Sequence, residues 1–299
     1  MPSEHAPRFD AIVVGGSYAG MSAALQLARA RRRLLVIDAG QRRNRFAAAS
    51  HGFLGQDGRA PGEIAADARR QLLQYPNVEW IDGLALEARA RGDGFAVTTE
   101  AARFDAARLL LATGVVDELP PVEGLAERWG RSVFHCPYCH GYELDNGRIG
   151  VLATGPLALH QAMMLPHWGQ VTLFTDGRLE PDAAQAAALQ ARGVRIEPAR
   201  VLRIADTATV VLADGRHAVL DGLFTATRLR MASPLAAQLG CAFDEGPMGP
   251  FVRTGPTRET TVPGVFACGD AARAAGNVAL AVGDGALAGA GVHQSILFR

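Results

Sequence analysis

The chain opens with a strand, a glycine-rich turn, a helix and a second strand, and this order constrains its fold more than any other feature. The apolar run FDAIVV (9–14) is followed by GGSYAG (15–20), a helix-like segment (21–32) and the buried-type strand LLVID (34–38). Two strands joined through a helix form a βαβ unit, which places them parallel in one sheet with a right-handed crossover. The sequence therefore predicts an α/β fold built on a Rossmann-like sheet.

The glycine-rich turn predicts a dinucleotide-binding site. Peptide N–H groups converge on a helix N-terminus, where the partial positive charge favours a pyrophosphate. Small residues at Gly15, Ser17 and Gly20 let phosphates approach the backbone, although the usual middle glycine is a serine here. Asp38 ends the second strand, and a carboxylate there suits the hydroxyls of an adenosine ribose. The alternative is a strand–turn–helix packing junction that binds nothing.

The same pattern returns in weaker form in the middle of the chain. The strand-like run 147–155 ends in a glycine turn and precedes a helix-like segment (156–169) and a strand-like run (171–177). The stretch 115–124 before it is rich in proline and acidic residues, and GPMGPFVRTGP (246–256) looks like the return crossing. Such a pattern predicts a second βαβ domain inserted in the first.

We therefore predict two Rossmann-like FAD/NAD(P)-binding domains of the three-layer type. Residues 1–115 plus 245–299 form the first, discontinuous domain, and residues 117–243 form the inserted domain, which carries a CxxC motif. The second turn has Ala153 where the nucleotide fingerprint has its first glycine. No basic cluster follows the next strand, although recognition of a 2′-phosphate normally uses arginines there. Two alternatives therefore stay open. The inserted domain binds NADP(H) or NAD(H) productively, or it keeps only the fold.

Composition argues against several classes of partner. Thirty acidic residues balance thirty basic ones, so electrostatics gives no reason to expect nucleic acid or an anionic membrane. All the basic residues are arginine, which excludes mechanisms that need a lysine. No apolar run approaches the length of a membrane span, and no secretory signal is recognisable at the start. With four cysteines in a chain of this length, we expect a cytoplasmic protein in a reducing compartment.

The segment HCPYCH (135–140) places Cys136 and Cys139 two residues apart, with His135 and His140 on either side. CxxCH is also the haem attachment signal, but that chemistry belongs to exported proteins. Four zinc ligands within six residues would struggle to close a tetrahedron, and the other two cysteines are isolated, so we predict no metal. A static disulfide or a pair of inert thiols is the structural alternative.

Redox activity is the favoured interpretation of this pair. Cysteines at this spacing close a small ring readily, and a helix that begins there would lower the pKa of one thiol. His140 is the better candidate for moving the proton, because imidazoles titrate near neutral pH. His135 is either a second proton carrier or a structural residue.

Together these motifs resemble the low-molecular-weight thioredoxin reductases over essentially the whole chain. The dinucleotide turn, the CxxC in an inserted domain and VPGVFACGD (262–270) occur together in that family. The segments GGSYAG, HCPYCHGYE, MLPHWG and GNVALAVGDGA look more like its dithiol oxidase subgroup. Those gliotoxin- and holomycin-type enzymes close disulfides in small natural products.

The resemblance implies that the cofactor is FAD. It implies that Gly269 and Asp270 contact the ribityl and phosphate region of FAD, and that Asn277, Val278 and Ala279 open a helix that faces the flavin ring. It also implies that Thr113 and Gly114, at the end of a strand, pass near FAD. Arg45 and His51 lie in the loop that the family uses to contact the flavin.

The resemblance also implies an activity. Cys136 is the outer sulfur that exchanges with substrate, and Cys139 is the inner sulfur that passes two electrons to FAD. His140 stands where the family commonly has an acid. The missing basic clamp for NADPH favours an enzyme that oxidises a dithiol and passes electrons to FAD and then to oxygen or another acceptor. The runner-up is an NADPH-dependent thioredoxin or disulfide reductase, and a non-catalytic flavoprotein redox sensor is the alternative of another class. We expect a homodimer that acts on a small-molecule dithiol or disulfide or on a thioredoxin-like protein.

Overall fold

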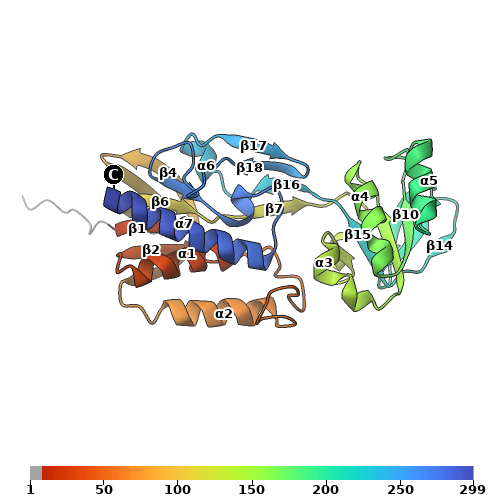
Figure 1. The fold of residues 1–299 in the computed structure, drawn as a ribbon, viewed down its shortest axis with the longest axis horizontal. Coiled ribbons are helices and arrows are strands. Elements are labelled where there is room, and N and C mark those ends of the chain that lie inside the picture. The colour runs from red at the N-terminus through yellow and green to blue at the C-terminus, as the bar shows by residue number, and fades with distance from the viewer. Residues whose placement is uncertain (1–8, 299) are drawn as a thin grey trace, which may run out of the picture. The chain divides into compact units, whose positions relative to one another are not determined.

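The computed structural model describes residues 9–298 and divides them into two compact units (Figure 1). Unit 1 contains residues 9–45, Pro61–Val116 and residues 229–298. Unit 2 contains Phe46–Ala60 and Asp117–Arg228. Each unit has its own parallel-strand core, and the predicted α/β class with Rossmann-like folds is confirmed.

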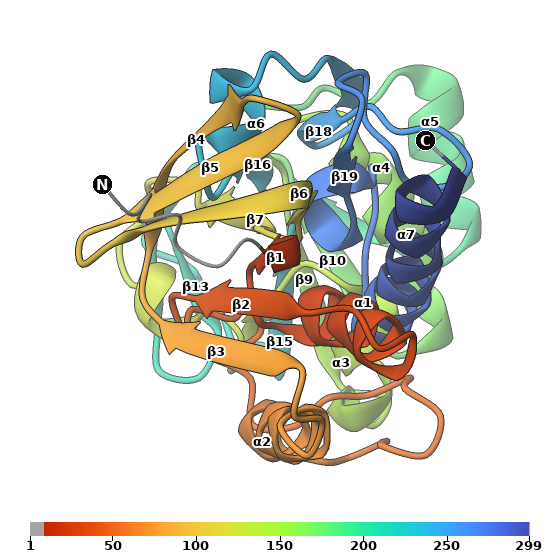
Figure 2. The same ribbon diagram turned by 90° about the vertical axis from the view of Figure 1, so that its left-hand side faces the viewer.

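Unit 1 is built on a sheet with the strand order β3-β2-β1-β6-β5-β4, and β19 also pairs with β6 (Figure 2). Its centre is parallel, and its strands there are almost wholly apolar and buried, as expected of a sheet that is covered on both faces. In register, Val13 lies opposite Val36 on one side and Leu110 on the other. The strands are β1 (Phe9–Val14), β2 (Leu34–Asp38), β3 (Val78–Asp82), β4 (Ala85–Arg91), β5 (Gly94–Thr99), β6 (Arg103–Leu111) and β19 (Val265–Ala267).

Two helices of unit 1, α1 (Tyr18–Arg29) and α7 (Val278–Phe298), lie side by side (Figure 1). A Cβ atom at Gly285 would overlap the carbonyl oxygen of Ala19, and one at Gly289 would overlap that of Ala23. The backbones of α1 and α7 therefore approach as closely as glycine allows. The other helical segments of this unit are α2 (Pro61–Leu72), α6 (Leu235–Gln238) and η4 (Gly269–Ala272). Within residues 9–298, no helix is both long and apolar enough to cross a bilayer.

The segment predicted to be the return crossing forms a hairpin instead. Strands β17 (Phe243–Gly246) and β18 (Gly249–Val252) pair antiparallel, and Gly246 lies opposite Gly249. Gly249 has a φ of 142°, which only glycine adopts readily, so the glycines that suggested a crossing serve a tight turn. The two segments at the unit boundary are β7 (Val115–Glu118) and β16 (Arg228–Met231), which pair in a ribbon of their own.

Unit 2 is built on a parallel sheet with the strand order β11-β10-β9-β15-β8, accompanied by an antiparallel sheet β12-β13-β14. Phe174 and Phe224 are fully buried in its core. The strands are β8 (Val133–Phe134), β9 (Arg148–Leu152), β10 (Gln170–Phe174), β11 (Arg195–Glu197), β12 (Val201–Ala205), β13 (Thr209–Leu212), β14 (His217–Ala218) and β15 (Gly222–Thr225). The helical segments are η1 (Ala126–Arg128), α3 (Pro137–His140), η2 (Tyr142–Leu144), α4 (Leu157–Met164), η3 (Leu165–His167) and α5 (Ala183–Ala191).

The close packing of α1 on α7 predicts that Gly289→Leu destabilises unit 1. The added side chain meets backbone atoms that cannot rotate away, so the free energy of unfolding should fall by at least about 1–3 kcal/mol. Gly283→Ala is the control, because a Cβ atom there meets no neighbouring atom. The substitution only lowers the backbone entropy of the unfolded chain. Urea unfolding of the FAD-bound protein should show a stabilised control and a destabilised Gly289 variant. Equal midpoints for the two variants would contradict the packing argument.

Candidate functional site

The dinucleotide turn of unit 1 is shaped by two positions that only glycine fits. Gly15 has a φ of 101°, and a Cβ there would overlap the carbonyl oxygen of Ala112. A Cβ at Gly20 would overlap the carbonyl oxygen of Gly15. Ser17 precedes α1 as its N-cap residue but makes no side-chain capping bond, so its hydroxyl is not used by the helix. The turn therefore presents peptide N–H groups and a hydroxyl at the start of a twelve-residue helix.

Asp38 is held beside this turn at the end of β2. The Gly16 N–H donates to its Oδ1 atom over 2.9 Å. This bond uses one carboxylate oxygen, which leaves the other for a ribose hydroxyl. The arrangement of glycines, helix N-terminus and carboxylate fits the adenosine diphosphate half of FAD.

A buried carboxylate supports the Gly269–Asp270 segment. The side chain of Asp284 has no exposed surface, and its Oδ2 atom accepts from the Gly269 N–H over 2.9 Å. Its other oxygen pairs with Arg258 at 2.6 Å and with Arg273 at 3.0 Å. Two guanidinium groups and a peptide N–H stabilise the buried charge, which would otherwise be costly. Asp284 therefore fixes the backbone that presents Asp270.

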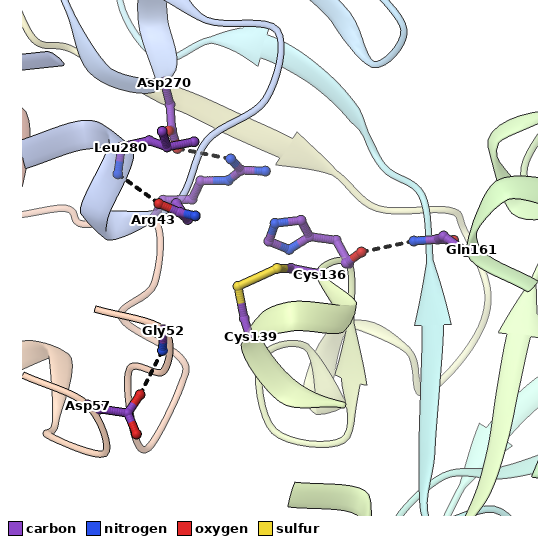
Figure 3. The surroundings of a disulfide bond; sticks show 10 residues. Arg43, Gly52, Asp57, Cys136, Cys139, Gln161, Asp270 and Leu280 are labelled. Atoms are coloured by element: carbon purple, nitrogen blue, oxygen red, sulfur yellow. Dashed lines mark hydrogen bonds and ion pairs between the residues drawn. A yellow bond between two sulfur atoms is a disulfide. The ribbon is translucent and has the colours of Figure 1, made fainter. Parts of the chain in front are cut away.

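Asp270 is paired with Arg43, a residue that the sequence did not single out. The Arg43 Nη1 and Asp270 Oδ2 atoms are 2.9 Å apart, and both side chains are mostly buried (Figure 3). A Cβ at Gly276 would overlap the Asp270 carboxylate, so this glycine leaves room for the pair. Arg45, which was predicted to approach FAD, is exposed and donates to the carbonyl of Arg42. The segment QRRNRF (41–46) contains three arginines, and nothing local indicates which of them meets Asp270.

The other predicted FAD contacts lie at element ends of unit 1. Asn277 accepts from the Leu280 N–H over 2.8 Å and so caps α7, whose first residues are Val278 and Ala279 (Figure 3). The predicted helix start is confirmed. Thr113 and Gly114 follow β6 directly, and Gly114 has a φ of 67°. That these five residues contact FAD stays a prediction.

The CxxC of unit 2 follows the carboxyl end of β8, where ligands meet parallel sheets. Cys136 and Cys139 form a disulfide, with their Cα atoms 5.4 Å apart. Cys136 is the N-cap residue of α3, and Pro137 is its first residue. The cysteines thus open a helix as expected, but α3 has only four residues, so its dipole is weak. Cys241 and Cys268 are buried free thiols of unit 1, and burial raises the pKa of both, which makes them unreactive.

A hydrogen bond between Gln161 and His135 fixes the backbone directly before Cys136 in the sequence. The Gln161 Nε2 atom donates to the His135 carbonyl over 2.9 Å (Figure 3). Gln161 is 8% exposed and comes from α4, so the sequence could not predict this contact. The His135 ring stacks on Trp129 with 5.9 Å between ring centroids, which favours a structural role for the ring in this state.

His140 is partly buried against an aromatic ring. Its imidazole stacks on Phe134 with ring centroids 4.3 Å apart. Burial lowers the pKa of His140 to about 4, while Glu143 partly opposes this effect and His51 adds to it. The expectation that His140 titrates near neutrality is therefore wrong for the disulfide form. A thiolate on the neighbouring Cys139 would raise the pKa of His140, because an opposite charge stabilises the imidazolium.

His51 lies in the loop Phe46–Ala60 of unit 2. Its Nδ1 atom is 3.4 Å from Glu143, which belongs to η2, and 3.8 Å from Asp57. The loop is closed by the Gly52 N–H, which donates to Asp57 over 2.7 Å (Figure 3). The contact of His51 with FAD stays a prediction. Among residues 9–298, no group of three His, Cys, Asp or Glu side chains is arranged to hold a metal ion.

A dinucleotide turn in one Rossmann-type unit and a CxxC disulfide in the other define a class of nucleotide-dependent disulfide oxidoreductases. The family model of the pyridine nucleotide-disulphide oxidoreductases matches residues 9–285, and the chain belongs to this family. The family is a class of FAD-dependent enzymes that typically use NADPH, so FAD is the cofactor.

Individual relatives confirm the predicted resemblance to thioredoxin reductase-like flavoproteins. The chain is 35% identical to thioredoxin reductase tcpT of Claviceps purpurea, over 94% of this chain and 92% of that protein. Its structure matches the oxidoreductase from Agrobacterium tumefaciens with a TM-score of 0.96 and 59% identity, over 98% and 100% of the two chains. It matches HlmI with a TM-score of 0.90 and 33% identity, over 98% and 94%.

The Arg43–Asp270 pair predicts that Arg43→Met weakens FAD binding. Asp270 is predicted to contact FAD, and loss of the guanidinium would leave its carboxylate uncompensated beside an anionic cofactor. A charge-assisted hydrogen bond contributes about 1.5–3 kcal/mol, so the Kd for FAD should rise about tenfold or more. Arg45→Met is the matched control and should bind within about twofold of the wild type. FAD fluorescence on dilution measures both, and the reverse order of effects would show that Arg45 is the cofactor contact.

The partly buried imidazole of His140 predicts a pH-dependent stability of the disulfide form. An unfolded histidine has a pKa near 6.5, whereas the pKa of His140 in the folded protein is about 4. The unfolded chain binds more protons between these values, so the free energy of unfolding falls as the pH drops through this window. His140 accounts for at most about 3 kcal/mol of that fall.

His140→Phe should therefore flatten the pH profile of urea unfolding between pH about 6.5 and about 4. His217→Gln, at an exposed position on β14, is the control and should leave the profile unchanged. A His140→Phe profile as steep as that of the wild type would contradict the burial argument.

Proposed function

We propose that this protein is an FAD-dependent dithiol oxidase. It oxidises a small-molecule dithiol to a disulfide through Cys136 and Cys139, and electrons pass to FAD and then to oxygen or another acceptor. Membership of a disulfide oxidoreductase family and the Cys136–Cys139 disulfide support the thiol chemistry. The proposed direction of electron flow rests on one observation: the Asp176 carboxylate, at the end of β10, is already bonded to other residues of unit 2.

The side chain of Asp176 is used internally at the end of β10, where a nucleotide ribose would be recognised. It is 3% exposed and accepts from the Val201 N–H over 2.8 Å. It also pairs with Arg178 at 3.1 Å and Arg200 at 3.3 Å. A ribose would meet no uncommitted carboxylate there, and a 2′-phosphate would have to displace an ion pair. This arrangement supports the dithiol rather than NADPH as the electron donor.

The turn before α4 supports the same conclusion. Pro156 is the N-cap residue of this helix and offers no N–H to a pyrophosphate. The Thr154 hydroxyl donates to the Ala226 carbonyl over 2.8 Å and is used within the unit. The turn therefore has fewer donors for a dinucleotide than the turn of unit 1.

The sulfur chemistry follows from the disulfide state. A substrate thiolate attacks the Cys136 Sγ atom, the bond between the two cysteines breaks, and Cys139 leaves as a thiolate. The second substrate thiol attacks the substrate sulfur of the mixed disulfide, which releases Cys136 and the disulfide product. Bound FAD supplies the two-electron acceptor that returns the cysteine pair to the disulfide. Tyr138, between the cysteines, is 73% exposed and Tyr142 is 83% exposed, which supports an apolar small molecule as substrate.

An NADPH-dependent reductase of thioredoxin or another disulfide is the second candidate. It is favoured by the family's usual use of NADPH and by Arg178 and Arg200, two arginines brought together at the end of β10.

We also propose that residues 1–115 plus 245–299 form the FAD-binding domain and that residues 117–243 form the domain with the CxxC. We propose a cytoplasmic homodimer from the resemblance to the low-molecular-weight thioredoxin reductases.

Anaerobic rapid mixing separates the two candidates. We expect dithiothreitol to bleach the bound flavin at least about tenfold faster than NADPH at the same concentration, because the dithiol enters through Cys136. Cys139→Ser should keep FAD bound but slow dithiol-driven bleaching by several orders of magnitude, because the covalent route is lost. The measurement is the flavin absorbance after mixing.

Cys241→Ala is the matched control for the loss of a cysteine, because this thiol is buried in unit 1, whereas the CxxC belongs to unit 2. It should bleach at the wild-type rate. Fast reduction by NADPH with slow reduction by dithiols would make the protein a reductase. An undiminished rate in Cys139→Ser would remove the cysteine mechanism altogether.

A further inference from the structure

A tryptophan of unit 1 that the sequence did not single out packs against the dinucleotide turn. Trp80 lies in β3, where it pairs in register with Val36 of β2. The position that a Cβ atom of Gly16 would take is 2.3 Å from the Trp80 Cη2 atom and 2.7 Å from the Asp38 Cβ atom. The indole ring and the base of the Asp38 side chain therefore meet on the same side of the turn.

The indole ring is the reason that position 16 is a glycine. Gly16 is not one of the three fingerprint positions, and its φ lies outside the left-handed region, so its backbone does not require glycine. Any larger residue would have to displace the ring. The Gly16 N–H also donates to the Asp38 Oδ1 atom over 2.9 Å. Trp80 thus lies beside the carboxylate that suits the adenosine ribose.

A carboxylate and a guanidinium hold the ring of Trp80 in place. The Trp80 Nε1–H donates to the Oδ1 atom of Asp82 over 2.9 Å. Arg69, in the last turn of α2, donates to the Oδ2 atom of the same carboxylate over 2.9 Å. The Arg69 Cζ atom also lies over the indole, 4.3 Å from the ring centroid. One carboxylate therefore fixes two planar groups that already attract each other by a cation–π interaction.

This assembly lies at the edge of the sheet where ligands bind. Asp38 and Asp82 are opposite each other at the carboxyl ends of β2 and β3, which are parallel neighbours (Figure 2). In open α/β sheets, ligands bind outside the carboxyl ends of the strands. Trp80 is partly exposed, and the side chain of Arg69 is 38% exposed. Planar surface is therefore accessible next to the carboxylate that suits the ribose.

A second stack in unit 1 shows what the same components do elsewhere. Arg33 lies over the ring of Phe9, 4.8 Å from its centroid, and pairs with Glu79 at 3.0 Å. Phe9 begins β1, Arg33 precedes β2, and Glu79 is the second residue of β3, so this stack lies at the amino ends of the strands. An arginine on an aromatic ring is therefore not by itself a ligand site. The Trp80 stack differs because it lies beside the dinucleotide turn.

We infer that Trp80 and Arg69 form the binding surface for the adenine ring of FAD. When Asp38 meets the ribose hydroxyls, the attached base reaches the neighbouring strand end, where the indole and the guanidinium suit the flat face of a purine. Asp82 is a positioning residue, since it acts by holding both groups. This surface selects the base of the cofactor, and the inference is independent of the proposed dithiol oxidation and of the direction of electron flow.

The test compares FAD with flavin cytosine dinucleotide, which differs from FAD in the base alone. The full chain is loaded with either dinucleotide and diluted, and the free flavin is measured after ultrafiltration. The wild type should bind FAD about tenfold more tightly, because a purine offers the larger face for stacking. Trp80→Leu and Arg69→Met should each raise the Kd for FAD about tenfold but that for the cytosine analogue at most about threefold. Trp80→Phe keeps an aromatic face and should retain the preference for FAD.

Arg33→Met is the matched control, because it removes the same kind of ion pair and stack at the other edge of the sheet. Its Kd for FAD should stay within about twofold of the wild-type value.

Intrinsic fluorescence gives a second readout that a structural role would not change. The other two tryptophans, Trp129 and Trp168, belong to unit 2. ADP contains the adenine without the flavin, so it reports on contact with the base alone. Added to the flavin-free full chain, ADP should quench the emission of the wild type and leave that of Trp80→Phe unchanged.

Several results would overturn the inference. If Trp80 only supported the turn, Trp80→Leu would weaken the binding of both dinucleotides equally. A wild type without a preference for FAD, a preference that survives in Trp80→Leu and Arg69→Met, or an ADP signal that persists in Trp80→Phe would also contradict it. A loss of affinity in Arg33→Met as large as that in Arg69→Met would assign the effect to the stability of the unit. A protein that selects adenine as expected but is not bleached by dithiols would refute the oxidase alone.

Discussion

The packing of backbone against backbone around α1 is the constraint on which unit 1 depends. Gly15 and Gly20 allow the turn to approach β6 and to close on itself, and Gly285 and Gly289 allow α7 to lie directly against the helix. A side chain at any of these positions would move the helix N-terminus that is suited to a pyrophosphate. The cofactor contacts expected at the start of α7 depend on the same packing, since one helix positions the other.

Unit 2 depends on a different balance, between the burial of an imidazole and the charge of a sulfur. His140 is neutral while Cys136 and Cys139 are joined, because desolvation outweighs the attraction of Glu143. A thiolate on Cys139 would raise the pKa of His140, because an opposite charge stabilises the imidazolium. The exposed tyrosines and the internal bonding of the Asp176 carboxylate are the features on which the proposed oxidation of a small dithiol rests.

Local patterns allowed much of this architecture to be predicted from sequence. Strands β1 and β2 begin and end where the apolar runs do, and α7 begins after Asn277 as expected, because apolar runs and helix caps are short-range signals. The CxxC carries its chemistry within six residues and needed no tertiary information. The hairpin of β17 and β18 was missed because glycine and proline mark turns and crossings alike.

The missed residues share a different cause. Arg43 meets Asp270 across 227 positions of sequence, Gln161 reaches His135 across 26, and Arg200 reaches Asp176 from another strand end. Such contacts are set by the packing of elements and leave no local signature. The same is true of the lowered pKa of His140, which comes mainly from desolvation by burial in the folded unit.

The central claim is that the Cys136–Cys139 pair and FAD exchange electrons as one redox system. The most direct measurement is an anaerobic titration with dithionite in which free thiols and flavin absorbance are followed in the same sample. A disulfide and a flavin each take up two electrons, so the account predicts that about four electron equivalents are consumed per chain and that thiols and reduced flavin reach equilibrium with each other at every addition. A fully bleached flavin beside an intact disulfide, unchanged on standing, would contradict it.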